Sequence, residues 1–540
     1  MCMINRIGVE NSKFNNLNNN DARKNNDGRV QNPNFKGLGG IALAGIQACE
    51  KMPMVNVAVV DLLSAILPRT IVESMTNPFA GFEAFRRESS GLVVNCLIPS
   101  VITLGIAKVI NNGFMPKGVN MSGCWADSTL IDKAAEYYKN TKSSDKVKES
   151  LSPILGNIEG FNGDKKVVFK DSLGEAAIEE YAKKLAEISR QKDNGKEVSR
   201  IANEIIEKTH VAENIKISGA KEVKASSINT MLSDSVKFFR EFQKAPKDTL
   251  IDDFAKQSKK LVKTKSLMGL AIVLPLAISM QYINRWITEK VSGVKGAPIY
   301  DDFGKTENLN NSQIAKEGLL KQKLISISSM LGVSLLSMMK MPSMNMLEFK
   351  GMFPTMDQAR IISTATFGSR MAAADDKNEL AEATVRDIAT FSSLYFLGDY
   401  AAKGAATIIQ NKTGITLLNE TKTIEKDANI FKKIWHWVKD TNVKSSEEVF
   451  SKTAEKLKEQ GKAITASDKK IIESELKRAK NLRSACQIAN LGVSLALLGI
   501  VIPIFTRSNT KKRHEQDLKL AKENQINSNN NINKFDAKKI

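Results

Sequence analysis

The chain has 540 residues, of which 42% are hydrophobic, 6% aromatic and 26% charged, and its formal net charge is +20. A mean hydropathy of −0.24 is typical of a soluble chain, so any membrane-embedded part must be diluted by long polar segments. The basic excess fits an anionic lipid surface, nucleic acid or simply solvated lysine-rich helices. Because the basic clusters carry no aromatic platform on which bases could stack, the composition argues against nucleic acid as a partner.

The five cysteines are far apart and include no CxxC motif, so they do not form the framework of a disulfide-rich domain. We expect them to behave as small buried hydrophobic residues. The first 36 residues are polar and lack the apolar core of a secretory signal. The sequence therefore predicts no cleavable signal peptide, and an internal helix would have to direct the chain into a membrane.

Apolar runs and polar segments alternate along the chain and divide it into seven regions. These are an asparagine-rich disordered tail (1–36), an apolar region (37–112), a helical polar domain (113–262), a membrane region (263–410), a polar helical segment (411–483), a transmembrane span (484–506) and a tail that is first basic and then asparagine-rich (507–540).

In the apolar region, residues 37–75 are interrupted by charges and prolines, and their longest clean piece is too short to cross a bilayer alone. They predict a kinked span, a re-entrant hairpin or an interfacial helix. The stretch around Phe79, Phe82 and Arg86–Arg87 predicts a turn at the headgroup level, or a soluble loop. Residues 89–107 are uncharged and predict a span that Pro99 breaks near its middle.

The polar domain (113–262) contains amphipathic runs with helical spacing and few strand signals. Ser172 and Glu175 have the spacing of a capping box, which predicts a helix start at Ser172. The piece NGDKKVVFKD, residues 162–171, predicts one short hairpin in an otherwise helical domain.

The membrane region begins with residues 266–284, an apolar run preceded by lysines and followed by Trp286, the order expected at a membrane interface. Two weaker spans are predicted at 324–347, which Lys340 interrupts, and at 388–409, which contains Asp399 and Lys403. The final run, 484–506, has no charge and matches the roughly 20 residues that a helix needs to cross about 30 Å of hydrocarbon. A helix starting near Ser467 could run into this span without a break.

Asp399 and Lys403 form the first candidate site. They are four residues apart, so on a helix they face the same side and can pair. Ionisable groups at membrane depth are costly and often line an ion or substrate path. The simpler reading is an ordinary pair on a water-exposed helix. Upstream, Asp375, Asp376 and Glu379 resemble a divalent metal site, but an acidic helix start is the better reading.

Seven methionines between residues 338 and 356 could offer thioether ligands to Cu(I). No cysteine or histidine accompanies them, so we interpret them as adaptable packing residues and predict no metal and no cofactor. The three histidines are scattered, and the chain has no HExxH, GxSxG, P-loop or dinucleotide glycine pattern. We therefore expect no catalytic residues, and a membrane-bound enzyme ranks third among the functions considered.

Residues 430–440, IFKKIWHWVKD, predict an amphipathic helix with Phe431, Ile434, Trp435 and Val438 on its apolar face and lysines opposite. Such a helix suits the headgroup layer of a membrane, although a helix docked on a soluble core shows the same spacing.

Small residues also recur at helical spacing, which lets helices approach closely in lipid. They are Ala485, Ala489, Gly492, Ala496 and Gly499 in the last span, and Gly398, Ala402 and Ala406 in the 388–409 stretch. They predict a bundle of spans, or pairing between chains in a homo- or hetero-oligomer.

The sequence thus predicts a mainly α, multi-pass helical membrane protein with helical polar domains between the spans. We expect it to reside in the plasma membrane, or in the inner membrane of a bacterium. The leading function is an integral membrane scaffold or interaction protein whose basic helices contact the lipid bilayer, including anionic headgroups, or partner helices. The alternatives are a transporter or channel-like protein that uses Asp399, Lys403 and helices broken at Pro99 and Pro275, and a large soluble helical protein.

Overall fold

The computed structural model describes residues 53–76, 78–162, 165–191, 195–212, 215–217, 227–292, 318–338, 347–351, 353–375, 377–420, 428–459 and 466–506, with scattered positions from 508 to 523. These residues belong to one compact unit. The predicted asparagine-rich tails and most of the methionine run lie outside the described residues.

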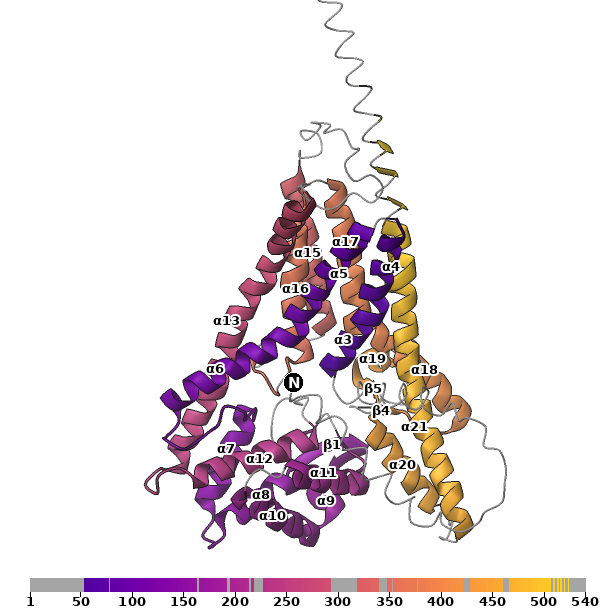
Figure 1. Cartoon of the computed structure of the whole chain (residues 1–540). Helices are drawn as coiled ribbons and strands as arrows, with labels where there is room; N and C mark the ends of the chain where they lie inside the picture. The colour runs from indigo at the N-terminus through magenta and orange to yellow at the C-terminus, as the bar shows by residue number, and fades with distance from the viewer. Residues whose placement is uncertain are drawn as a thin grey trace, which may run out of the picture. The chain divides into compact units, whose positions relative to one another are not determined.

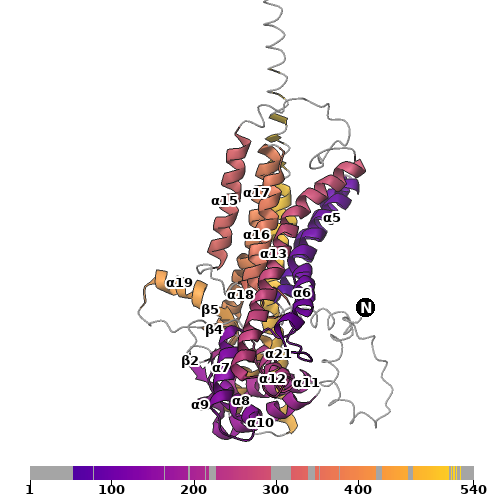
Figure 2. The same ribbon diagram turned by 90° about the vertical axis from the view of Figure 1, so that its left-hand side faces the viewer.

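The prediction of a mainly α chain is confirmed (Figures 1 and 2). The α-helices are α3 (Pro53–Asp61), α4 (Leu67–Thr76), α5 (Pro78–Leu92), α6 (Ile98–Phe114), α7 (Ser128–Asn140), α8 (Lys146–Gly156), α9 (Phe169–Leu173), α10 (Glu175–Arg190), α11 (Gly195–Thr209), α12 (Ile228–Gln243), α13 (Ile251–Ser292), α15 (Leu319–Met338), α16 (Met356–Ala373), α17 (Lys377–Ser392), α18 (Gly398–Thr413), α19 (Ile430–Asp440), α20 (Ser446–Glu459) and α21 (Ala466–Ser494).

Five short strands complete the secondary structure of the described residues. β1 (Ile158–Asn162) pairs in antiparallel fashion with both β2 (Lys165–Val168) and β3 (Lys216–Ile217), and β4 (Leu418–Glu420) pairs with β5 (Thr441–Val443). The β1–β2 register places Asn162 opposite Lys165, which confirms the hairpin predicted from residues 162–171.

One hydrophobic core extends from Met115 to Val262 and joins α7, α8, α10, α11, α12 and the first turns of α13. Its centre is aromatic, with the rings of Phe238 and Phe254 at 5.3 Å and those of Phe242 and Phe254 at 5.2 Å. Tilted and edge-to-face pairs of this kind add to the stabilisation from burial. We refer to residues 115–262 as the polar domain.

The helix start predicted at Ser172 is wrong. Ser172 lies inside the single turn of α9, and α10 begins after Gly174, which takes a positive φ of 78° and caps the helix without a side-chain bond. The chain needs the left-handed conformation here to turn from one helix directly into the next, and glycine adopts it without steric cost. A capping box is present elsewhere, between Thr355 and Gln358 at the start of α16.

Five helices in the described part of the chain are long and apolar enough to cross a membrane. They are Met54–Met75, Pro78–Phe114, Ile251–Val291, Leu319–Met338 and Ser474–Thr506. The three stronger predicted spans, 89–107, 266–284 and 484–506, fall within them. The fourth helix begins earlier than the predicted span 324–347, and residues 339–346 of that span lie outside the described residues.

The structure bears on two of the weaker predictions. Residues 54–75 form one continuous helix with a π turn inside it, which agrees with the predicted kinked span and not with the re-entrant hairpin. Residues 388–409 are helical, through α17, a π turn and α18, but they are not among the five because Asp399 and Lys403 lower their hydropathy.

Within the described residues, four π-helical turns interrupt the helices: η2 (Leu62–Ile66), η3 (Val93–Leu97), η5 (Ser393–Leu397) and η6 (Leu495–Val501). Three of these turns, η2, η3 and η6, end two residues before a proline. The prolines are Pro68, Pro99 and Pro503. Proline has no N–H to donate and crowds the carbonyl four residues earlier, and a wider turn accommodates both defects. The helix therefore continues through Pro99, and α13 continues through Pro275, so the prediction of helices broken at these prolines is wrong.

The apolar helices pack against one another and against α16 and α17. α13 contacts both α6 and α16, and α15 contacts both α16 and α17 (Figures 1 and 2). The approach of α13 to α6 is close at Gly269, where a Cβ atom would come within 2.4 Å of Thr103 Oγ1. We call the assembly of α3–α6, α13, α15–α18 and α21 the bundle.

The segment that includes α20 connects the bundle to the polar domain. α20 packs against α21 on one side and against α11 on the other. Glu448 Oε1 accepts a hydrogen bond from Ala212 N at 3.0 Å, and Asn419 Nδ2 donates to Phe161 O at 3.1 Å. As predicted, α21 starts near Ser467 and continues without a break into the last apolar helix. Arg483 is not a solvated flank of this helix, because it is buried and donates to the Lys444 carbonyl.

Candidate functional site

The bundle contains a network of buried arginine–carboxylate pairs, which we call the charged core. It comprises Arg69 from α4, Glu83, Arg87 and Glu88 from α5, Arg370 from α16, and Glu382, Arg386 and Asp387 from α17. Four arginines and four carboxylates thus join four helices.

Glu88 is the centre of the charged core. Its Oε1 lies 2.7 Å from Arg69 NH1 and 3.5 Å from Arg87 Nε, and its Oε2 lies 3.5 Å from Arg370 NH2. Arg370 NH1 also pairs with Asp387 Oδ1 at 2.8 Å. Buried charges are stable only when paired in this way, and removal of one partner leaves the others uncompensated. The core therefore fixes how α4, α5, α16 and α17 sit together.

Other helices of the bundle, α6, α13, α15 and the helix that ends at Thr506, carry an aliphatic outer surface. Its exposed residues include Val101, Val109, Leu267, Ile272, Leu324, Leu331, Leu336, Ile488, Ile500 and Ile504. Leu336 is 77% exposed, whereas Asp387 is 1% exposed. A water-soluble bundle distributes these residue types in the opposite way. An apolar outside around an ionic inside is the arrangement that a hydrocarbon solvent favours.

Neutral polar side chains also face the inside of the bundle. Thr366 Oγ1 donates to Asn95 Oδ1 at 2.8 Å, and Asn284 Nδ2 donates to Ser90 Oγ at 2.7 Å. In α21, Gln487 Nε2 donates to Asn56 Oδ1 at 2.5 Å. Such bonds between helices replace the hydrophobic driving force that is absent in lipid.

The small residues predicted to form the packing face of the last helix are only partly buried. Gly499 is buried, and a Cβ atom there would come within 3.1 Å of Pro68, whereas Gly492 and Ala496 are exposed. The polar residues Gln487, Asn490 and Ser494 are buried as well. In α18 the small residues do pack: Ala402 and Ala406 are buried with Ala479 and Cys486 of α21. This packing occurs within one chain.

The structure places the predicted pair Asp399–Lys403 on α18. Asp399 is exposed, and Lys403 is buried. Lys403 Nζ donates to the Val438 carbonyl at 2.9 Å and lies over the rings of Tyr400 and Trp437, at 5.2 and 5.8 Å. No ion pair joins Lys403 to Asp399 among the described contacts, because the lysine turns toward α19.

The acidic residues after α16 contact α13. Arg285 binds Asp375 and Glu379 together, and Glu379 Oε2 accepts a hydrogen bond from Asp375 N at 2.8 Å. Asp375 and Glu379 flank the start of α17, where a carboxylate also suits the helix dipole. Within the described residues, no group of three or more histidine, cysteine or acidic side chains could hold a metal ion.

α19 is the predicted amphipathic helix, and its apolar face is open. Phe431 is 79% exposed, and Ile434 and Trp435 are exposed as well, while Val438 is partly buried. The helix is attached on another side, where Trp437 stacks on Tyr400 with centroids 6.1 Å apart and donates from Nε1 to Thr407 Oγ1 at 3.2 Å. None of the residues that the structure describes therefore covers the Phe431–Trp435 face.

Most of the charged core was not predicted from the sequence. Phe82, Arg86 and Arg87 were expected in a turn, but all three lie in α5. Arg87 pairs with Glu83, and Arg86 NH2 donates to the Asn284 carbonyl at 3.1 Å. The sequence did contain a signal for this pair. Glu83 and Arg87 are four residues apart and stand just before an apolar run, so on a helix they lie on the same side and can be buried together.

No protein-family model, no curated protein and no solved structure matches the chain.

Proposed function

We propose that the chain is an integral, multi-pass membrane protein that holds its polar domain and α19 at the membrane surface as a scaffold for interactions. The observation that carries this proposal is the distribution of side chains in the bundle, with aliphatic residues outside and paired charges inside. Five helices of sufficient length and apolarity supply the membrane-embedded part. A soluble helical protein with this structure would expose all of these aliphatic side chains to water.

α19 supports the placement of the membrane surface. Its uncovered Phe431–Trp435 face is apolar, and Lys432, Lys433 and Lys439 occupy the rest of the helix. A helix with this composition lies in the headgroup layer, with its aromatic side chains at the acyl boundary and its lysines near anionic headgroups. We propose that α19 rests on the bilayer in this way, attached to the bundle through Trp437.

Carbonate extraction of membranes that contain the expressed protein tests the proposal. The protein should remain in the pellet and dissolve only in detergent, while a peripheral control protein in the same membranes is released. Release of the full chain into the supernatant would contradict the proposal, and the apolar helices would then have to be explained as parts of a soluble assembly.

The second candidate function is a transporter, which the buried charges inside the bundle favour because such groups often line ion paths. The pairing of every carboxylate of the charged core with an arginine favours the scaffold instead. Proteoliposomes that carry the Asp399→Asn/Lys403→Ala variant separate the two. A transporter should lose ion flux that the wild type shows, whereas a scaffold should show no protein-dependent flux in either form.

A further inference from the structure

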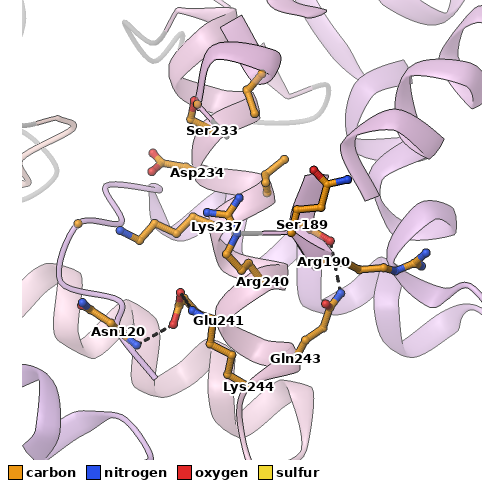
Figure 3. A pocket seen from close by; sticks show the side chains of 15 residues that line it. Asn120, Ser189, Arg190, Ser233, Asp234, Lys237, Arg240, Glu241, Gln243 and Lys244 are labelled. Carbon is orange, nitrogen blue, oxygen red and sulfur yellow. Dashed lines mark hydrogen bonds and ion pairs between the residues drawn. The ribbon is translucent and has the colours of Figure 1, made fainter. Parts of the chain in front are cut away.

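The polar domain contains an open cavity of about 710 Å³ between α10, α11, α12 and the loop that precedes α7 (Figure 3). Four basic side chains line it, Arg190, Lys237, Arg240 and Lys244, against two acidic ones, Asp234 and Glu241. A cavity of this size holds a small organic molecule, and its charge balance favours an anion.

Both acidic side chains are already engaged. Glu241 Oε1 lies 2.6 Å from Lys244 Nζ, and its Oε2 accepts a hydrogen bond from Asn120 N at 2.7 Å. Asp234 is buried and accepts from Trp125 N at 3.0 Å. Burial raises the pKa of the Asp234 carboxyl to about 6, so this group also carries less negative charge at mildly acidic pH.

Three of the four basic side chains that line the cavity also have partners among the described residues, and the exception is Lys237. Arg190 NH2 pairs with Asp145 at 2.5 Å, and Lys244 pairs with Glu241. Lys237 reaches toward the loop of Asn120, and its ammonium group makes no hydrogen bond or ion pair with any residue that the structure describes (Figure 3). Arg240 NH2 is held by the Ile188 carbonyl at 3.3 Å.

Gly123 provides the space that Lys237 uses. A Cβ atom at residue 123 would come within 2.7 Å of Lys237 Nζ, so any other residue there would displace the ammonium group. The carbonyls on either side of Gly123, those of Ser122 and Cys124, accept hydrogen bonds from Lys265 Nζ at 2.9 and 2.6 Å. Lys265 directly precedes the apolar stretch 266–284. Its hydrogen bonds therefore connect the loop around Gly123, which lines the cavity, to the start of that stretch.

We propose that this cavity binds a phosphate monoester, with Lys237 and Arg240 as the residues that contact the phosphate. A phosphate dianion matches two cationic side chains and accepts the charge-assisted hydrogen bonds that they donate. Ser189 and Ser233 add hydroxyl groups to the lining. None of the described lining residues is aromatic, so a nucleobase would find no stacking surface. The ligand is the monophosphorylated headgroup of a lipid or a soluble phosphate ester.

The test uses the full chain in nanodiscs of phosphatidylcholine and two probes. One probe is soluble glycerol 3-phosphate, and the other is phosphatidylinositol 4-phosphate incorporated into the nanodiscs. The binding of each probe is measured as the increase in the Tm of the protein. Stabilisation by the soluble probe identifies a soluble ester, and stabilisation by the lipid alone identifies a headgroup. Absence of stabilisation by either probe would overturn the proposal.

Two variants test the residues. Lys237→Gln/Arg240→Gln should weaken binding about tenfold or more, which is the scale for loss of charge-assisted bonds. The matched control Lys183→Gln/Lys247→Gln removes the same charge from exposed positions outside the cavity and should bind as the wild type does. Gly123→Ala keeps every charge but displaces Lys237, and it should also weaken binding. Equal losses in the cavity variant and the control, or wild-type binding by Gly123→Ala, would contradict the assignment.

Discussion

The bundle and the polar domain place the same residue types on opposite sides of their helices. In the polar domain, Phe238 and Phe254 are buried, and ion pairs such as Lys133–Glu136 lie on the surface. In the bundle, Leu331 and Leu336 lie on the surface, and the charged core is buried. The two regions therefore bury opposite residue types, which is the difference expected if, as proposed, the bundle lies in hydrocarbon and the polar domain in water.

The largest expected effect comes from the charged core. Glu88→Gln removes the charge that three arginines share, and the loss of one partner of a buried pair costs about 3–5 kcal/mol. Glu136→Gln breaks an exposed pair with Lys133 and should cost no more than about 1 kcal/mol. Thermal unfolding of both variants in detergent checks the difference, and similar shifts in Tm would show that the charged core does not hold the bundle together.

A new charge on the outer surface distinguishes the two solvents. Leu331→Lys places an ammonium group on the aliphatic face of α15, which should cost about 2.5–3.5 kcal/mol in hydrocarbon. The matched variant Leu250→Lys alters an exposed leucine of the polar domain and should be close to neutral. The measurement is the yield of membrane-integrated protein and its Tm. If Leu331→Lys were as harmless as Leu250→Lys, the face would be in water.

The polar domain should show a pH dependence that originates from Asp234. Burial raises the pKa of this carboxyl from 3.8 to about 6, so the folded state retains a proton that the unfolded state has already lost. Its contribution to stability is therefore fully present below pH 4, falls as the pH rises from about 4 to about 6, and stays low above that.

Asp234→Asn isolates this effect. The amide oxygen can still accept the bond from Trp125 N, and it has no charge to desolvate. Relative to the wild type, the variant should gain about 2 kcal/mol between pH 4 and pH 7, since each pKa unit corresponds to about 1.4 kcal/mol. A difference in Tm between the two proteins that does not change with pH would refute the shifted pKa.

The smallest expected effect concerns α19. A fluorescent label at Trp435→Cys should be quenched by spin-labelled lipid in nanodiscs more strongly than the same label at Lys432→Cys, because only the first position lies on the apolar face. Equal, weak quenching at both positions would place α19 in water.

The sequence was informative wherever a property depends on neighbouring residues. Length and hydropathy located the helices around residues 89–107, 266–284 and 484–506, and spacing identified α19. For the helix at Met54–Met75 the sequence left a kinked span as one of three alternatives, because Asp61 and Pro68 divide its apolar run, and nothing in local propensity anticipates that a π turn accommodates the proline.

The charged core depends on contacts that sequence spacing does not contain. Arg370 and Glu88 are 282 positions apart, so no local pattern links them. For Lys403, local spacing predicts a contact that the structure does not have. Its distance of four residues from Asp399 predicts an ion pair, whereas tertiary packing directs its ammonium group to the Val438 carbonyl. The polar face of α21 could have been predicted, since Gln487, Asn490 and Ser494 recur at helical spacing inside an uncharged span.

The most direct test of the central claim measures which solvent the outside of the bundle contacts. A nitroxide at Leu336→Cys, in a chain whose native cysteines are replaced by alanine, would be examined in nanodiscs for collisions with oxygen and with a water-soluble nickel chelate. We expect frequent oxygen collisions and few nickel collisions at residue 336, and the reverse at Leu250→Cys in the polar domain. Nickel collisions at residue 336 as frequent as those at residue 250 would place the aliphatic surface in water and contradict the account.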